Sequence, residues 1–229
     1  MKSVLRALSG KFQKFTTIAC ISLVFSAGHV SAQQQPEFQV DFTDAGLVPS
    51  HWSLRVSPDG SGHFDSDGGN VTAQQTGHMT VSELHRNIQL SSSLANQIFS
   101  VAHSRHFFNV PCESHMKVAF QGTKRFTYTG PDGSGSCTFN YSKDKQIQEL
   151  GSTLMGVEYT ILTGGRLEML LLHDRLGLDQ ELESFADALH NGNAADPEVI
   201  RDTLMRIADD DQVMDRARKR AHALLAEPR

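Results

Sequence analysis

Hydrophobic and polar residues alternate most clearly between residues 126 and 141. Phe126 and Tyr128 alternate with threonines, and Phe139 and Tyr141 alternate with polar residues after a Pro-Asp-Gly-Ser-Gly segment. An alternation of period two places every second side chain on the same face of a strand. The pattern therefore predicts a β-hairpin whose two arms present one face to the core.

The segment Pro-Asp-Gly-Ser-Gly occurs twice, at residues 131–135 and at residues 58–62. Proline presets φ, aspartate bonds to its own backbone and glycine accepts a positive φ, so the segment is typical of a turn. The first copy lies between an alternating run at 52–56 and Phe64. The sequence therefore predicts a second hairpin with the same turn.

Further strands and one loop are predicted from the same pattern. Alternation predicts short strands at 38–42 and 78–85, and Val118 belongs to a strand predicted to begin near Lys117. The polar, glycine-rich stretch 65–77 is typical of a loop. These elements surround the two hairpins in the first part of the chain.

Apolar residues recur at helical spacing in one early segment and throughout the second half of the chain. The serines at 91–93 cap a predicted helix that ends at Phe107-Phe108. A longer amphipathic helix is predicted from Ser142, its cap, to Gly164-Gly165, its stop. Further helices are expected around residues 167–177, 179–191, 196–207 and 209–225.

Strands come first and helices last, which indicates an α+β fold. We expect an antiparallel sheet built from the two Asp-Gly hairpins, with a helix packed on one face, followed by an all-helical C-terminal part. Residues 33–141 would form the sheet-and-helix part, and residues 142–229 the helical part packed on it. No linker rich in proline, serine or charge separates the two parts, so we expect one fused unit.

The first 32 residues have the composition of a secretory signal peptide. Basic residues precede an apolar run at about 18–27, and Val30-Ser31-Ala32 is a small-x-small cleavage site. The run is shorter than the roughly 20 residues that a membrane-spanning helix needs. We therefore expect export and a mature chain that begins at Gln33. A lipid anchor on Cys20 and an uncleaved signal are the alternatives.

Removal of the signal peptide leaves a strongly acidic chain. The signal contains 4 of the 21 lysines and arginines and none of the 26 acidic residues, which leaves 17 basic against 26 acidic residues and a net charge of −9. Nucleic acids and anionic membranes attract clustered positive charge. The sequence therefore argues against nucleic acid as a partner, and no second apolar run of spanning length follows.

Two of the three cysteines remain after removal of the signal, Cys112 and Cys137. In an oxidising compartment two cysteines most simply pair with each other. Such a bridge closes a loop of about 25 residues and stabilises the fold by roughly 3 to 3.5 kcal/mol in the chain-entropy model. A reactive Cys–His pair is the alternative, although export disfavours a free thiol.

Histidine is frequent, with 11 residues, and His103 and His106 have a spacing found in metal sites. Their i, i+3 separation places two imidazoles on one face of a predicted helix, and His115 and Glu113 follow the next turn. Metal sites need a third or fourth ligand and fixed outer partners. We therefore take His103, His106 and His115 as candidate metal ligands, with solvated surface histidines as the alternative.

Two short motifs suggest other chemistry, but neither is complete. Asp65–Asn70 resembles the start of a calcium loop, yet the glycine and the acid that an EF-hand needs are displaced, so only an irregular calcium loop stays open. Ser114–Lys117 and Ser142–Lys145 match the Ser-x-x-Lys pattern of penicillin-recognising enzymes, whose other motifs the sequence lacks. We therefore predict no catalytic residue and no cofactor.

A larger succession of segments spans about residues 50 to 160. It comprises His51–Leu54, Pro58–Gly62, His106–Asn109, Cys112–Ser114 and Tyr128–Gly133. The order of strand, Asp-Gly turn, strands, helix ending in Phe-Phe, hairpin and helix resembles a family of uncharacterised exported α+β domains of environmental bacteria. The resemblance implies export and an α+β fold, and it transfers no activity and no functional residue to this chain.

Together these observations predict an exported non-enzymatic protein, periplasmic or extracellular, that acts by binding. A protein partner would dock on the turns at 58–62 and 131–135, because loops on a rigid sheet often carry recognition, or on the C-terminal helices. The alternative is a hydrolase or metal-dependent enzyme that uses the three candidate histidines and Glu113 near the disulfide.

Overall fold

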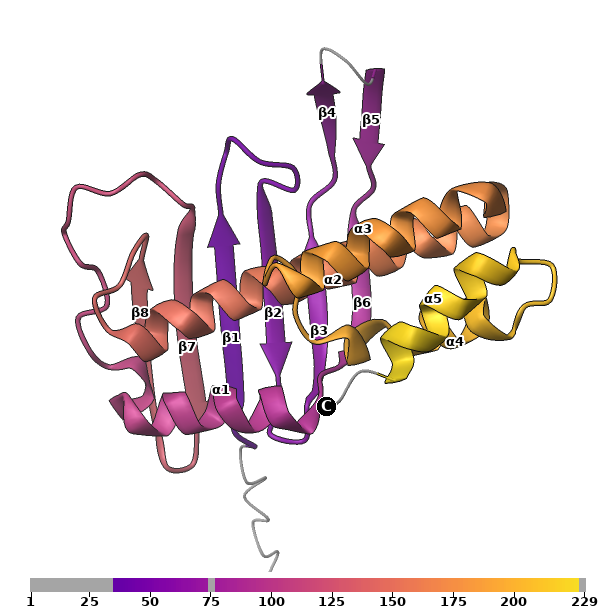
Figure 1. The fold of residues 1–229 in the computed structure, drawn as a ribbon. Helices are drawn as coiled ribbons and strands as arrows, with labels where there is room; N and C mark the ends of the chain where they lie inside the picture. Colours follow the sequence, from indigo (N-terminus) through magenta and orange to yellow (C-terminus); the bar gives the residue numbers. More distant parts are fainter. Residues whose placement is uncertain (1–34, 74–76, 227–229) are drawn as a thin grey trace, which may run out of the picture. The chain divides into compact units, whose positions relative to one another are not determined.

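The computed structural model describes residues 35–73 and 77–226, which all belong to one compact unit (Figure 1). The predicted signal peptide and its cleavage site lie outside the described residues. The unit contains an antiparallel sheet, two helices packed on the sheet and a mostly helical C-terminal part. This confirms the predicted α+β class.

The main sheet has six antiparallel strands in the order β6-β3-β2-β1-β7-β8. Both predicted hairpins are present, β2 with β3 and β7 with β8, and β1 lies between them. The strands are β1 (Glu37–Thr43), β2 (His51–Val56), β3 (Ser61–Ser66), β6 (Leu84–Gln89), β7 (Thr123–Gly130) and β8 (Gly133–Phe139).

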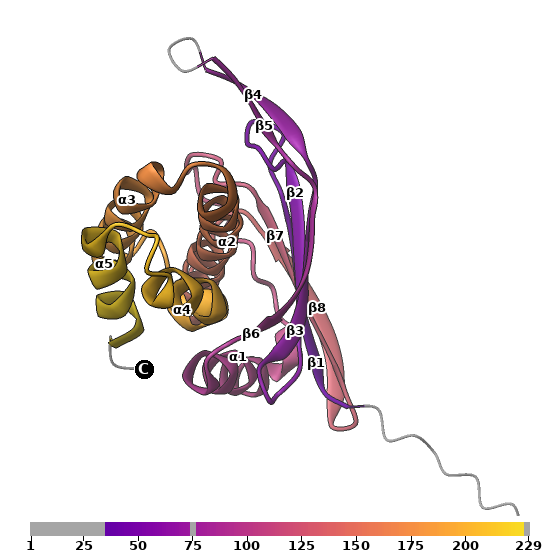
Figure 2. The same cartoon turned by 90° about the vertical axis from the view of Figure 1, so that its right-hand side faces the viewer.

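One face of the sheet is covered by helices. Both α1 (Ser92–Ser104) and α2 (Lys145–His173) lie on this side, as Figure 2 shows. The predicted cap of α1 is present, because the Ser91 hydroxyl accepts a hydrogen bond from the Leu94 N–H at 3.2 Å. Strand residues at every second position, such as Phe38, Leu54 and Phe126, are fully buried beneath the helices.

The opposite face of the sheet, which we name the open face, lies away from all the helices of the described residues (Figure 2). Period-two alternation places the polar half of each strand here, as expected for an antiparallel sheet with one solvated face. Its side chains include those of Gln39, Asp41, Ser53, Arg55, His63, Asp65, His85, Asn87 and Arg125.

The C-terminal helices form a second apolar cluster with the last turns of α2. Within it, the buried Asp179 carboxylate accepts a hydrogen bond from Arg220 Nε at 2.9 Å, which ties the third helix to the last one. The elements are η2 (Arg175–Gly177), α3 (Leu178–His190), η3 (Pro197–Ile200), α4 (Arg201–Asp209) and α5 (Asp215–Ala226).

The predicted stop at Gly164-Gly165 is wrong, since α2 continues through both glycines to His173. A Cβ added to Gly164 would lie 2.4 Å from Ile200 Cγ2, so this glycine lets η3 pack closely against α2. The glycine is therefore a packing position rather than a helix terminus. The start of α2 also differs, because Asp144 and not Ser142 caps it, accepting the Gln146 N–H at 3.0 Å.

The predicted loop at 65–77 is also wrong over most of its length. Residues 65–66 complete β3, and β4 (Gly69–Ala73) pairs with β5 (Gly77–Val81) as a two-stranded ribbon that extends from β3 and β6 (Figure 1). The strand predicted at 78–85 is divided between β5 and β6. Backbone pairing overrides the low strand propensity of this glycine-rich stretch.

No strand forms near Lys117, contrary to prediction, and residues 109–122 have no regular structure. The Asn140 side chain satisfies this loop's backbone instead: its Oδ1 accepts the Gln121 N–H at 2.6 Å, and its Nδ2 donates to the Ala119 carbonyl at 3.2 Å. The apolar side chains of Met116 and Phe120 are consequently more than half exposed, at 52% and 62%.

Cys112 and Cys137 form a disulfide, with an S–S distance of 1.98 Å and a Cα–Cα distance of 5.8 Å. The bridge ties the start of the 109–122 loop to β8. Within the described part of the chain, no helix has both the length and the apolar character needed to cross a membrane.

Candidate metal centre

Three side chains that bind metals in many proteins meet on the open face, where β3 pairs with β6. His63 and Asp65 are two residues apart on β3, so they point to the same side of the sheet. Asp65 lies directly opposite His85 on β6 in the antiparallel register. Pairing of the two strands therefore brings together residues that are 20 positions or more apart in the sequence.

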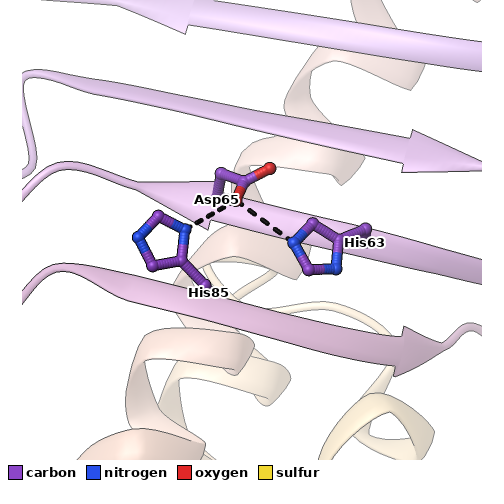
Figure 3. A group of neighbouring side chains, drawn as sticks. All are labelled: His63, Asp65 and His85. Carbon is purple, nitrogen blue, oxygen red and sulfur yellow. Dashed lines mark hydrogen bonds and ion pairs between the residues drawn. The ribbon is translucent and has the colours of Figure 1, made fainter.

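The three side chains converge on one carboxylate oxygen, as Figure 3 shows. Asp65 Oδ1 lies 2.7 Å from His85 Nδ1 and 3.2 Å from His63 Nε2. One ligand atom from each residue lies within 4.8 Å of the other two. His63 and Asp65 are half-buried and His85 is exposed, so the cluster is accessible from solvent.

The remaining nitrogen of each histidine has its own hydrogen-bond acceptor. His63 Nδ1 lies 2.8 Å from Asn87 Oδ1, and His85 Nε2 lies 3.0 Å from Glu83 Oε1. An acceptor at one ring nitrogen holds the proton there and leaves the other nitrogen as the one that gives up a proton to a metal. Both inward nitrogens are therefore oriented toward the same point.

The second oxygen of Asp65 also has a partner, because Arg55 Nη2 lies 3.5 Å from Asp65 Oδ2. The hydrogen bond from His85, together with the charge of His63, lowers the pKa of the Asp65 carboxyl. Hydrogen bonds to Asp65 and Glu83 raise the pKa of His85. In the absence of a metal, the cluster is therefore a carboxylate held between two imidazoles that share its protons.

Two imidazoles and one carboxylate form a ligand set that suits Zn²⁺ and neighbouring divalent transition metals. Within residues 35–73 and 77–226, this is the one group of three or more His, Cys, Asp or Glu side chains with ligand atoms close enough to hold an ion. Each ligand also has an outer partner of the kind that orients metal ligands in proteins. The residues present therefore fit a transition-metal ion.

The three histidines proposed from the sequence do not gather in this way. His103, on α1, lies 3.4 Å from Asp132 and packs against the rings of Phe107 and Tyr128. His106 lies in the turn η1 (His106–Phe108), and His115 lies in the 109–122 loop. Within the described residues none of them belongs to a group of three potential ligands. Their metal binding stays a prediction.

Glu113, the fourth residue of that hypothesis, has a structural role. Its carboxylate accepts the Asn140 N–H at 2.7 Å and the His115 N–H at 3.2 Å. These backbone hydrogen bonds, that of Asn140 first, lower the pKa of Glu113. The carboxylate therefore fastens the disulfide-bonded loop to the end of β8.

The two turns proposed as docking sites are partly used in packing. Gly60 is buried, and its carbonyl accepts the Leu90 N–H at 2.9 Å. A Cβ on Gly133 would lie 2.3 Å from the Phe107 ring, and one on Gly135 would lie 2.5 Å from the Phe107 carbonyl oxygen. The glycines of both turns therefore permit close contacts within the molecule.

Two other ionisable groups are buried, but neither belongs to the metal cluster. The Lys124 ammonium donates to the carbonyls of Gln121, Gly122 and Asn140 at 3.1 to 3.3 Å, and its burial lowers its pKa. Burial raises the pKa of Glu158 to about 7. The hydrogen bonds of Lys124 close the end of β7, which is a structural role.

The sequence contained a signal for the cluster that was not used. His63 and Asp65 alternate on one strand, and His85 ends the next strand predicted along the chain. The prediction placed Asp65 in a loop, so it separated the two β3 ligands. The register of β3 with β6 depends on a long-range pairing that spacing alone does not reveal.

Comparison with known proteins gives no further assignment of the site. No model of a protein family matches the chain. No curated protein matches it either. The resemblance to a family of exported α+β domains therefore stays a prediction, and the site is interpreted from its geometry.

Proposed function

We propose that this chain is an exported, non-enzymatic binding protein whose ligand is a divalent transition-metal ion, held by His63, Asp65 and His85. The proposal rests on one observation: a two-histidine, one-carboxylate cluster in which both histidines have acceptors on their outer nitrogens. Zn²⁺ is the simplest ion for this ligand set, and Co²⁺ is its spectroscopic substitute.

The outer partners favour metal binding over a simple polar network. Polar side chains on a solvated sheet face often bond to one another without any ligand. In this cluster, however, three side chains from two strands aim at one point, and Asn87, Glu83 and Arg55 each hold a ligand from behind. In known metal sites, loss of such an outer partner weakens metal affinity by about 10- to 100-fold.

Export is the second part of the proposal. The signal-like first 32 residues predict it, and the disulfide between Cys112 and Cys137 supports it, because disulfides persist mainly in oxidising compartments. We therefore place the protein in the periplasm or outside the cell. A metal-binding protein there would buffer or carry ions that enter from the environment.

Calorimetric titration of the tag-free protein with ZnCl₂ tests the metal site. We expect one equivalent of Zn²⁺ to bind, and we expect Asp65→Asn to weaken binding by at least about 100-fold because an amide oxygen carries no charge for the ion. The change is nearly isosteric, so the fold should be retained, which circular dichroism checks.

Asp41→Asn is the matched control. Asp41 also lies on the open face, but its carboxylate accepts hydrogen bonds from Gln39 at 2.9 and 3.1 Å and belongs to no ligand group. We expect its zinc affinity to stay within about twofold of the unmodified protein. Equal zinc binding by the Asp65→Asn variant would contradict the proposal.

A further inference from the structure

A hollow of about 420 Å³ lies on the open face beside the proposed metal centre. Its lining includes Arg55, His63 and Asn87, which also belong to the cluster or contact it. Glu37, Ser57 and Ser61 contribute the side chains at the other end of the hollow. This volume falls in the range of sites for small organic molecules, about 300 to 1,000 Å³.

A metal ion bound here would have coordination positions that the protein does not fill. All three ligands rise from two adjacent strands of one sheet face, so they approach the ion from the same side. Zinc sites with three protein ligands keep a fourth position for water or an exogenous ligand. The unfilled positions therefore face solvent and the neighbouring hollow.

Arg55 gives this hollow a cationic group beside the metal. It lies opposite His63 in the pairing of β2 with β3, and its side chain is 48% exposed. The contact with Asp65 Oδ2 is long, at 3.5 Å, which leaves most of the five guanidinium donors for another acceptor. Arginine binds carboxylates through two parallel hydrogen bonds.

The far end of the hollow favours hydroxyl groups over a second negative charge. Glu37 is an acceptor that repels anions and attracts hydroxyl donors. Ser57 and Ser61 add two hydroxyl groups, and Ser61 Oγ already donates to Asp59 Oδ1 at 2.6 Å, so its oxygen is oriented to accept. A ligand that matches both ends has one carboxylate and at least one hydroxyl group.

From this geometry we infer that the metal centre takes a small hydroxymonocarboxylate as a second ligand, whose carboxylate lies between the metal and Arg55 and whose hydroxyl groups point to Glu37 and Ser57. The inference rests on the proposed metal site. It adds the class of organic ligand that the metal-loaded protein binds.

A second cavity, of about 250 Å³, does not carry the same argument. It lies between the start of α1 and the C-terminal helices, and its buried acid, Asp196, is already used there to accept the Ser91 N–H at 2.9 Å. Arg201, the cation in its lining, lies 3.2 Å from Glu198. The charged groups of that cavity are thus paired within the protein.

Visible spectroscopy of the cobalt-loaded full-length protein tests the inference. Co²⁺ bound by nitrogen and oxygen ligands absorbs in the visible range, and the spectrum changes when a ligand enters its open positions. We expect D-glycerate to shift the spectrum with an affinity at least about tenfold higher than propionate, which lacks hydroxyl groups, or inorganic phosphate.

Arg55→Gln and Arg125→Gln are the matched variants, both read at saturating cobalt. Arg125 lies on the same open face but on β7, opposite Asp41, and takes no part in the hollow. We expect Arg55→Gln to weaken glycerate binding by at least about tenfold, because a charge-assisted pair is lost. Arg125→Gln should change it by less than about twofold.

The outcomes separate this inference from the metal site itself. A cobalt spectrum that glycerate does not change, or changes equally in the Arg55→Gln variant, would overturn the inference alone. An equal response to phosphate would overturn the hydroxymonocarboxylate assignment and leave a general oxyanion site. Absence of any cobalt spectrum would overturn the metal site and this inference together.

Discussion

Two groups of histidines lie at opposite ends of the sheet, and only one of them converges. On the open face, His63 and His85 point at the same Asp65 oxygen from neighbouring strands. Near β7 and β8, His103 contacts Asp132 and two aromatic rings, while His106 and His115 lie in separate turns. Strand register thus brings ligands together where helical spacing does not.

The comparison shows how a metal site differs from a local cluster of the right residue types. An i, i+3 pair such as His103 and His106 needs an unbroken helix to share a face, but α1 ends at Ser104. His106 and Phe107 instead have positive φ angles of 51° and 58°, which non-glycine residues seldom adopt. The helical argument for this pair therefore does not hold in the structure.

Removal of both open-face histidines should have the largest effect. We expect the double variant His63→Ala, His85→Ala to lose zinc binding altogether, because the remaining carboxylate alone is a poor site for Zn²⁺. The matched double variant, His103→Ala with His106→Ala, should bind zinc as the unmodified protein does. Calorimetry with ZnCl₂ on both variants makes the comparison, and the reverse result would move the metal site to α1.

Breaking the disulfide should affect stability but not metal binding. We expect replacement of Cys112 and Cys137 by serine to lower the free energy of unfolding by about 3 kcal/mol, as the chain-entropy model gives for a loop of this size. Urea denaturation followed by fluorescence measures the change. The bridge lies near β7 and β8, so zinc affinity below the denaturation midpoint should be unchanged; a parallel loss of zinc binding would show that the two ends of the sheet are coupled.

The smallest expected effect comes from an outer partner. Replacing Glu83 by Gln removes the charged acceptor behind His85 Nε2 and should weaken zinc binding by about tenfold. Glu113→Gln, which changes a carboxylate bound to backbone N–H groups near His115, is the control and should leave zinc affinity unchanged. A similar zinc affinity in the two variants would remove the argument from outer partners.

Most of the fold could be predicted from local patterns. The turns at 58–62 and 131–135, the cap at Ser91 and the α+β order all depend on residues close in the sequence. The errors occur where tertiary packing prevails. Gly164 lies inside α2 because Ile200 packs against it, and the glycine-rich ribbon β4–β5 forms because its two strands pair with each other.

The candidate site could not be predicted from spacing for a related reason. Asp65 and His85 become neighbours only when β3 pairs with β6, and the β4–β5 ribbon lies between them in the sequence. A shift of the register by one residue would move His85 to the covered face. The residue types were visible in the sequence, whereas the register that unites them is a property of the whole sheet.

The most direct test of the metal site is anomalous X-ray diffraction at the zinc edge, on crystals grown with one equivalent of Zn²⁺. We predict a single strong peak at about 2.0 to 2.2 Å from His63 Nε2, Asp65 Oδ1 and His85 Nδ1, the distances expected for nitrogen and oxygen ligands. A peak at His103, His106 or His115, or an open face without a peak in zinc-saturated crystals, would contradict the proposal.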